Sequence, residues 1–259
     1  MDKIKKLKKE IENSLDRYLP SEKTTPSILH KAMRYSIFSG GKRLRPIIIL
    51  LVGEILNVDK KKLIPFACGI EIIHNFSLIH DDLPAMDNDD FRRGRPTCHK
   101  KFGEDIAILA GDSLIALGFK LITETKLPSL VNFVADAIGS EGMAGGQVLD
   151  MLYKNKKINE KTKRRIDEMK TGKLFEVCFL GPCFCKRVNK QKKKILGDIS
   201  KNFGIAFQIR DDIEDKDGDV NKLKKNLSSV HKKLKKDIAK FGNKGIYLSD
   251  IIDKYYRID

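Results

Sequence analysis

The sequence predicts an all-α protein, a single-domain bundle of about ten or more helices around a central cleft. Apolar residues recur every three to four positions along most of the chain, and strand-like alternation is scarce. Turn-forming segments such as Ser39-Gly40-Gly41 and Lys126-Leu127-Pro128 separate the helical stretches. A length of 259 residues suits one large domain, and no linker rich in Pro, Ser or Gly divides it. We therefore expect one domain over residues 1–259.

Each expected helix follows from this periodicity. The first spans residues 3–18 and ends near Pro20, and its apolar residues share one face: Ile4, Leu7, Ile11, Leu15 and Leu19. The same spacing, interrupted by turn formers, predicts further helices over residues 26–38, 44–56, 61–83, 103–125, 128–138, 142–153, 160–181, 190–214, 227–240 and 246–256.

The chain is strongly basic, with 51 Lys and Arg against 35 Asp and Glu and a formal charge of +16. Lysines are scattered along amphipathic helices and concentrated in residues 186–194 and 222–236. No zinc-finger, recognition-helix or aromatic-interleaved strand pattern accompanies them. The charge thus indicates a solvated lysine-rich face, and we expect no nucleic-acid partner.

The cysteines and the hydropathy pattern indicate a soluble cytoplasmic protein. The five cysteines have no paired metal-binding spacing, and their odd number without a signal peptide favours a reducing compartment. We find no apolar run of about 18 residues, the length needed to cross a bilayer, and expect no stable membrane insertion.

Five carboxylates lie within residues 81–90 and are followed directly by Arg92 and Arg93. Such a cluster repels itself unless cations join it. Hard oxygen ligands suit Mg²⁺, which binds through one or two carboxylates plus substrate phosphates. A second cluster over residues 208–215 places Asp211 and Asp215 at i and i+4. The two clusters predict a metal-bridged phosphate ester in a shared cleft.

Either Asp-rich segment alone is more often a solvated loop or helix end. An apolar, helix-forming run precedes each of them, however, which favours delivery of the carboxylates into an interior. Asp81 and Asp87 are six positions apart and would point to different sides of an ideal helix. Because Pro84 disfavours helix at Leu83, we expect the chain to leave the helix there and to bring Asp87 back toward Asp81.

Four glycines crowd the start of the helix expected over residues 142–153: Gly139, Gly142, Gly145 and Gly146. Each costs about 1 kcal/mol against Ala in a helix. Close helix packing explains them, as does room for a substrate beside Gln147, and the two explanations are compatible.

Several motifs together resemble the trans-isoprenyl diphosphate synthases, most closely those of the bacterial farnesyl diphosphate synthase type. The segment over residues 81–87 resembles the first Asp-rich motif of that family, and residues 211–215 resemble the second. Further motifs match in family order over residues 40–46, 109–112, 142–150 and 170–174. The resemblance extends from the first helix to about Asp219 and implies the isoprenoid synthase fold.

The resemblance also implies roles for individual residues. It makes Asp81, Asp87 and Asp211 ligands of Mg²⁺, with three ions in all, and places Asp82, Asp212 and Asp215 around these ligands. The family's site for the allylic diphosphate corresponds to Arg92, Lys170, Thr171 and Gln208, of which the last three are expected to be catalytic. Its site for isopentenyl diphosphate corresponds to Lys42, Arg45, His74 and Arg93. For two of these residues another role stays open: Arg93 pairing with Asp90, and His74 as an ordinary core histidine.

The implied activity is Mg²⁺-dependent condensation of isopentenyl diphosphate with dimethylallyl or geranyl diphosphate to farnesyl diphosphate, in a homodimer. Phe76 lies five residues before Asp81, about 7.5 Å back along the helix, where a large ring would stop the growing chain. Geranylgeranyl diphosphate is the alternative product, and Phe76 as ordinary core is the alternative for the ring.

About 20 residues that the family carries after Asp219 are missing here, an estimate limited by boundary error. Because the missing segment helps to cover the allylic diphosphate, a weakly active regulatory or partner subunit of the same fold is a further alternative. Lys222, Lys224 or Lys225 could substitute for its lysine. A terpene cyclase is disfavoured, since it needs no isopentenyl diphosphate site.

Overall fold

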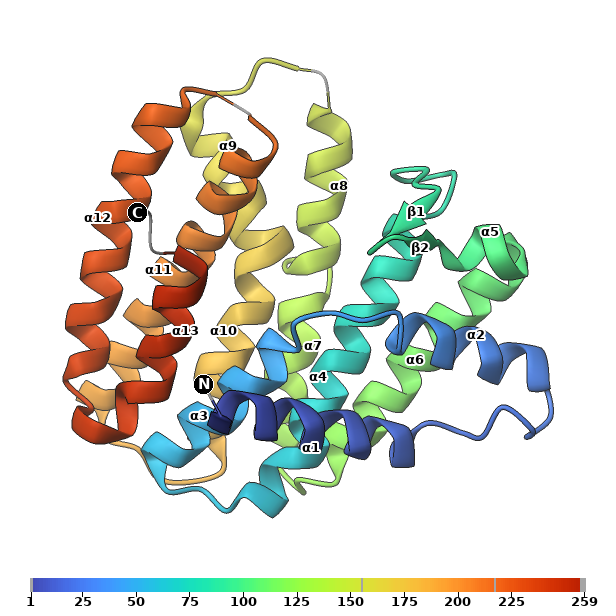
Figure 1. Ribbon diagram of the computed structural model, residues 1–259, viewed down its shortest axis with the longest axis horizontal. Coiled ribbons are helices and arrows are strands. Elements are labelled where there is room, and N and C mark those ends of the chain that lie inside the picture. The colour runs from blue at the N-terminus through green and yellow to red at the C-terminus, as the bar shows by residue number, and fades with distance from the viewer. Residues whose placement is uncertain (1, 155, 217, 257–259) are drawn as a thin grey trace. The chain divides into compact units, whose positions relative to one another are not determined.

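The computed structural model describes residues 2–154, 156–216 and 218–256, and this part of the chain is predominantly helical (Figure 1). The prediction of an all-α protein is confirmed. The chain divides into two compact units. The N-terminal unit comprises Asp2–Ile47 and Lys61–Lys126, and the C-terminal unit comprises Ile48–Lys60 and Leu127–Asp259. The single domain expected over residues 1–259 stays a prediction.

The N-terminal unit contains helices and one short hairpin. Their bounds are α1 (Asp2–Tyr18), α2 (Ser27–Ile37), the start of α3 (Leu44–Leu56), α4 (Lys60–Asp81), β1 (Phe91–Arg92), β2 (Arg95–Pro96), α5 (Cys98–Phe102) and α6 (Glu104–Thr123). The two strands are antiparallel, with Phe91 opposite Pro96 and Arg92 opposite Arg95. The hairpin is the only β-structure within the described ranges.

Two glycines bring α4 and α6 into close contact. A Cβ on Gly69 would lie 2.8 Å from the Gly118 carbonyl oxygen, and a Cβ on Gly118 would lie 2.6 Å from the side chain of Ile73. The helices therefore approach backbone to backbone along buried residues such as Ile70 and Ile122. This close approach fixes the position of the carboxyl end of α4, where the first Asp-rich segment begins.

The C-terminal unit is a set of helices around an aromatic core. Their bounds are α7 (Pro128–Ile138), α8 (Met143–Tyr153), α9 (Glu160–Asp167), a π-helical turn (Glu168–Gly172), α10 (Lys173–Leu180), a 3₁₀ turn (Gly181–Phe184), α11 (Lys190–Glu214), α12 (Val220–Ala239), a second 3₁₀ turn (Gly242–Gly245) and α13 (Ile246–Tyr256). Helices α11, α12 and α13 lie side by side (Figure 1).

Aromatic side chains join α10, α11 and α13 in this core. The rings of Phe175 and Phe203 lie with centroids 4.9 Å apart, and Phe203 also meets Phe179 at 5.4 Å and Tyr256 at 5.1 Å. All four are essentially inaccessible to solvent. Buried rings of this size contribute strongly to the hydrophobic stability of a domain. They hold α11, which ends at the second Asp-rich segment.

Three local features differ from the sequence prediction. Helix α12 begins at Val220 rather than near residue 227, because the side chain of Asp219 accepts the backbone N–H groups of Asn221 and Lys222 and so caps the helix. The helix expected over residues 160–181 is interrupted by the π-helical turn. Part of the expected loop before Thr97 forms the hairpin, and a short helix, α5, precedes α6.

Two helices pass a length and composition test for crossing a membrane, contrary to the expectation that no apolar stretch is long enough. They are α4 and α6, with mean hydropathies of 1.3 and 1.8 over their most apolar windows. Of the α4 window, 67% is buried inside the protein, and of the α6 window 39%. The core helices of soluble proteins pass the same test, so this observation is weak evidence for a membrane span.

Candidate functional site

The first Asp-rich segment turns back on itself as predicted. Helix α4 ends at Asp81, and the backbone N–H of Asp87 donates to the carbonyl oxygen of Asp81 at 2.9 Å. The intervening chain closes tight turns, with the N–H of Met86 bonded to the Leu83 carbonyl oxygen at 2.9 Å. The predicted return of the chain around Pro84 is confirmed. Metal binding by Asp81 and Asp87 stays a prediction.

Asp82 holds Arg92. The Nε of Arg92 donates to both carboxylate oxygens of Asp82 at 2.7 and 2.9 Å, and its Nη2 lies 2.6 Å from Oδ1. Burial raises the pKa of Asp82, although the hydrogen bonds and the charge of Arg92 oppose this shift. A forked contact of this kind fixes the plane of the guanidinium. The carboxylate of Asp82 is thus engaged with Arg92, in agreement with its predicted place around the metal ligands.

The β1–β2 hairpin presents Arg92 and Arg93 and was not predicted. Arg93 and Gly94 have φ angles of 56° and 73°. Positive φ at both central residues is typical of a two-residue type I′ hairpin turn. The Oγ1 of Thr97 donates to the Asp89 carbonyl oxygen at 2.8 Å and closes the base of the hairpin. The Arg93-Gly94 pair was the sequence signal for this turn.

Arg45, His74 and Arg93 are parts of one basic region in the N-terminal unit. Nη1 of Arg45 lies 3.2 Å from Nε2 of His74. Nη1 of Arg93 donates to the Gly40 carbonyl oxygen at 2.5 Å, whereas Asp90 pairs with Lys100 at 2.7 Å. The alternative pairing of Arg93 with Asp90 is therefore not what the structure contains. Lys42 is exposed at the turn that also carries Gly40.

His74 is held in its neutral form. Burial, together with the positive charges of neighbouring arginines, lowers its pKa well below the ordinary value, and the largest of these charge effects come from Arg45 and Arg93. A neutral imidazole nitrogen can accept the hydrogen bond that a guanidinium donates. The contact with Arg45 thus gives His74 a polar partner at the basic region, and its role as a ligand stays a prediction.

The second Asp-rich segment ends α11. The N–H of Asp215 donates to the Asp211 carbonyl oxygen at 2.9 Å, so the two residues have the predicted i and i+4 relation. The carboxylate of Asp212 receives Nε2 of Gln208 at 3.3 Å and Nζ of Lys163 at 3.1 Å. Gln208 is therefore positioned by Asp212, and Lys163 is a further cation that the sequence prediction missed.

Lys170 and Thr171 lie in the π-helical turn, a feature that is often found at functional sites. Nζ of Lys170 lies 2.6 Å from the Asp150 carboxylate of α8. A Cβ on Gly146 would lie 2.3 Å from the backbone nitrogen of Lys170. The packing explanation for this glycine is thus confirmed: only glycine lets α8 lie against the turn that carries Lys170.

Asp167 was also missed by sequence reasoning. Burial, followed by the negative charge of Asp212, raises its pKa to about 6, although Lys163 opposes the shift and Asp150 adds to it. Displaced pKa values are common at functional sites. No motif marks Asp167, because the shift arises from residues that only the fold brings near.

Phe76 lies on α4 with its ring edge-on to that of His80, with the centroids 5.7 Å apart. His80 in turn meets α6: its Nε2 lies 3.2 Å from the Ile108 carbonyl oxygen, and a Cβ on Gly111 would lie 2.1 Å from the same nitrogen. Phe76 is half-buried, and its role in limiting chain length stays a prediction.

The donor chemistry of the two Asp-rich segments fits Mg²⁺. No group of three or more His, Cys, Asp or Glu side chains forms a ready metal cage among the residues described. Mg²⁺ commonly binds through one or two carboxylates and completes its shell with water and substrate phosphates rather than with a protein cage. The backbone contact between Asp81 and Asp87 meets that requirement for a two-carboxylate set.

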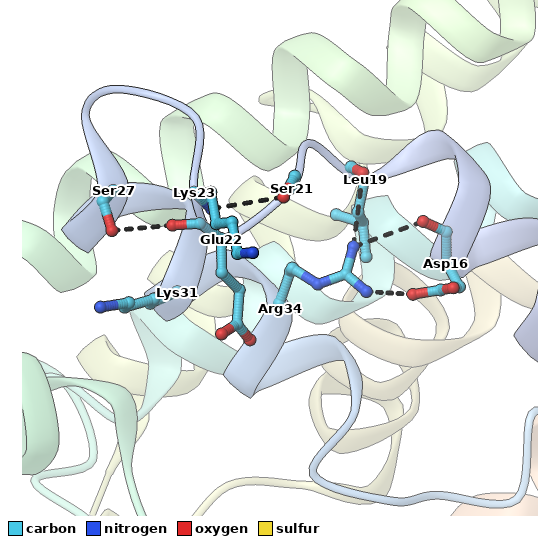
Figure 2. Close-up of a pocket in the computed structure, with 8 residues that line it drawn as sticks. All are labelled: Asp16, Leu19, Ser21, Glu22, Lys23, Ser27, Lys31 and Arg34. Carbon is cyan, nitrogen blue, oxygen red and sulfur yellow. Dashed lines mark hydrogen bonds and ion pairs between the residues drawn. The ribbon is translucent and has the colours of Figure 1, made fainter.

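A separate pocket of about 690 Å³ lies between the end of α1 and the start of α2 (Figure 2). Arg34 donates there to the carbonyl oxygens of Asp16, Leu19 and Pro20 and forms an ion pair with the Asp16 carboxylate. The pocket includes none of the predicted site residues. Its arginine serves to cap the carboxyl end of α1.

Fold and site together describe an all-α protein that combines two Asp-rich segments with cationic diphosphate-type contacts. The family model for polyprenyl synthetases matches residues 26–235. Farnesyl diphosphate synthase from Bacillus subtilis (strain 168) is 45% identical over 231 residues, covering 86% of this chain and 77% of that protein. Geranylgeranyl diphosphate synthase from Cyanophora paradoxa is 38% identical over 238 residues, covering 89% and 75%.

Solved structures agree. The crystal structure of an apo FPP/GFPP synthase from Zymomonas mobilis superimposes with a TM-score of 0.93 at 32% identity, covering 99% of this chain and 98% of that one. A geranyltranstransferase from Thermotoga maritima gives 0.86 at 31% identity, with 97% of each chain covered. The chain belongs to the polyprenyl synthetase family, and its fold is the isoprenoid synthase fold.

Proposed function

We propose that this chain is a short-chain trans-prenyltransferase that condenses isopentenyl diphosphate with dimethylallyl and geranyl diphosphates to give farnesyl diphosphate. Family membership and the farnesyl diphosphate synthases among its relatives, at 45% identity in the first case above, carry this conclusion. The return of Asp87 to Asp81 and the i, i+4 pair of Asp211 and Asp215 support it.

Loss of diphosphate from an allylic carbon needs positive charge at the departing oxygen, and a bound Mg²⁺ supplies such charge. We assign Asp81, Asp87 and Asp211 as the ligands, for three ions. Arg92, Lys170, Thr171 and Gln208 would hold the allylic diphosphate. The contacts of Arg92 with Asp82 and of Lys170 with Asp150 support this assignment, because each cation already has a fixed position.

We assign the isopentenyl diphosphate site to Lys42, Arg45, His74 and Arg93. The neutral state of His74 supports this, because the charges that lower its pKa converge on the place where an anion would bind. A diphosphate there would relieve the repulsion among Arg45, Arg93 and their neighbours. No side chain is assigned as a general base, and the released diphosphate is the proposed proton acceptor.

A product assay with purified protein tests the function. The wild type, given Mg²⁺, labelled isopentenyl diphosphate and each of three allylic primers, should yield labelled farnesyl diphosphate. Asp81→Ala and Asp211→Ala should lower turnover by about a hundredfold or more, since each removes a charged group that acts in the transition state. Asp16→Ala, which alters the pocket of Figure 2, is the matched control and should keep full activity. Undiminished turnover in excess chelator would refute the proposal.

Chain length separates farnesyl from geranylgeranyl diphosphate, which geranylgeranyl-forming relatives keep as the second candidate. Phe76→Ala removes a large ring and leaves an apolar space that a longer tail can fill. We expect products at least one five-carbon unit longer. A wild type that already makes mainly the C20 product, or an Ala variant with an unchanged product distribution, would exclude Phe76 as the limit.

We also propose that the protein is a cytoplasmic homodimer, as its resemblance to the family implies. Sedimentation at micromolar concentration should give twice the chain mass of 29.4 kDa. A stable monomer would overturn the dimer. Fractionation in which the protein stays with the membranes after a salt wash would overturn the cytoplasmic location.

A further inference from the structure

A buried ion pair lies next to the basic region but has no place in the site described above. Nη1 of Arg43 lies 3.0 Å from Oε1 of Glu71, and both residues are only 2% exposed. Nη2 of Arg43 also donates to the Ile37 carbonyl oxygen at 2.6 Å, at the end of α2. Buried charges are rare in proteins and persist where they are paired and hydrogen-bonded, as here.

The pair fixes a turn that is costly to form. Gly40, Gly41 and Arg43 have φ angles of 104°, 117° and 52°, and a positive φ is uncommon for a non-glycine residue such as Arg43. Strained backbone of this kind persists only when its surroundings determine it. Besides the pair, Nζ of Lys8 binds the Gly41 carbonyl oxygen at 3.0 Å.

Two neighbouring cross-links join this turn to α4. Arg43 reaches Glu71, and two residues further on Arg45 reaches His74, three residues along α4. Residues three apart on a helix share a face, so both contacts are made on one side of α4. The first is a buried charge pair and the second belongs to the basic region. The position of Arg45 relative to His74 therefore depends on the anchoring of Arg43.

Glu71 also sets the balance of charge. It neutralises Arg43, whose charge otherwise adds to those that act on His74, and it opposes the effect of burial on the pKa of Arg93. Without Glu71, the buried guanidinium of Arg43 would lack its compensating charge, an arrangement that is strongly destabilising.

We propose that Arg43 and Glu71 are positioning residues for the isopentenyl diphosphate site: their buried pair holds the Gly40–Arg43 turn against α4, so that Arg45 and His74 meet the diphosphate together. The proposal rests on the function proposed above. Neither residue touches the substrate. Loss of the pair should therefore weaken isopentenyl diphosphate selectively and leave the allylic diphosphate largely unaffected.

The test replaces the pair without leaving a lone buried charge. Arg43→Met combined with Glu71→Leu substitutes apolar side chains of similar volume, a change that buried ion pairs often tolerate. We expect native circular dichroism and a KM for isopentenyl diphosphate raised about tenfold to a hundredfold, as misplacement of a binding group by about 1 Å would produce. The KM for geranyl diphosphate should change by less than about threefold. Calorimetric titration of isopentenyl diphosphate should show the same loss of affinity without turnover.

Two further variants separate positioning from stability. Glu71→Asp keeps the charge but shortens the reach, so its KM for isopentenyl diphosphate should also rise, and it replaces the double variant should that one not fold. Asp253→Asn removes a carboxylate that binds His231 and Lys235 on α12. It should lower the melting temperature and leave both KM values unchanged.

The outcomes are distinct. A wild type that condenses no substrate overturns the proposed function and this proposal with it. An active wild type whose folded double variant, or Glu71→Asp, keeps its KM for isopentenyl diphosphate overturns the positioning pair alone. Equal increases in both KM values, matched by Asp253→Asn, show a general loss of stability and also overturn it.

Discussion

Replacing Gly146 by Ala should drive α8 away from the turn that carries Lys170. The new Cβ would lie 2.3 Å from the Lys170 nitrogen and 2.8 Å from both its Cα and the Met169 carbonyl carbon. All three atoms are backbone, so no side chain can rotate aside. Overpacking costs about 1–3 kcal/mol, and this contact belongs at the upper end. For a chain of this size about 3 kcal/mol corresponds to about 6–12 °C in melting temperature.

Gly197→Ala is the matched control. Gly197 lies within α11, and a Cβ there meets nothing within 4 Å. Both substitutions gain the same helix propensity, about 1 kcal/mol, so the difference between the two variants measures the contact alone. Scanning calorimetry should show Gly197→Ala at or above the wild type and Gly146→Ala well below it, with slower turnover because Lys170 has moved. Equal melting temperatures for the two variants would refute the reasoning.

Two further predictions concern the two units separately. The raised pKa of Asp167, about 6, means that the folded state holds a proton that the unfolded state has already lost, so its contribution to stability falls as pH rises from about 4 to 6. In chelator, Asp167→Asn should therefore gain on the wild type at pH 7 relative to pH 4.5 in thermal melts, and a constant gap between the two melting temperatures would contradict this. Gly41→Ala places a Cβ 2.8 Å from Nη1 of Arg93, whereas Gly40→Ala has a similarly strained φ but no neighbour within 4 Å. Both should lose stability, but only Gly41→Ala should raise the KM for isopentenyl diphosphate, and equal KM values for the two variants would count against displacement of Arg93.

Most helices could be predicted because their apolar spacing is a local property of the sequence. The expected ranges 44–56, 128–138 and 246–256 coincide with α3, α7 and α13. The start of α12 was missed because Asp219, an acidic residue after a glycine, was taken as part of a turn rather than as a helix cap. The hairpin was missed because each strand has only two residues, too few for alternation to be visible.

The candidate site was predictable where motif and local geometry coincide, as in the return of Asp87 to Asp81. The supporting contacts were not predictable. Arg43 stands between Lys42 and Arg45 in a basic motif, and its burial depends on Glu71, which lies 28 residues away in the sequence. The contact of Lys163 with Asp212 spans 49 residues. Such pairings exist only once the helices have packed.

The π-helical turn at Glu168–Gly172 has a consequence for how this chain can change in length. A π-helical turn holds one residue more than an α-helical turn. Deleting any one residue of this segment would restore continuous α-helix and rotate everything after it by about 100°. Phe175 and Phe179 would then turn away from Phe203 and out of the aromatic core. Single-residue deletions should therefore be rejected here, although exposed turns elsewhere in the chain can absorb them.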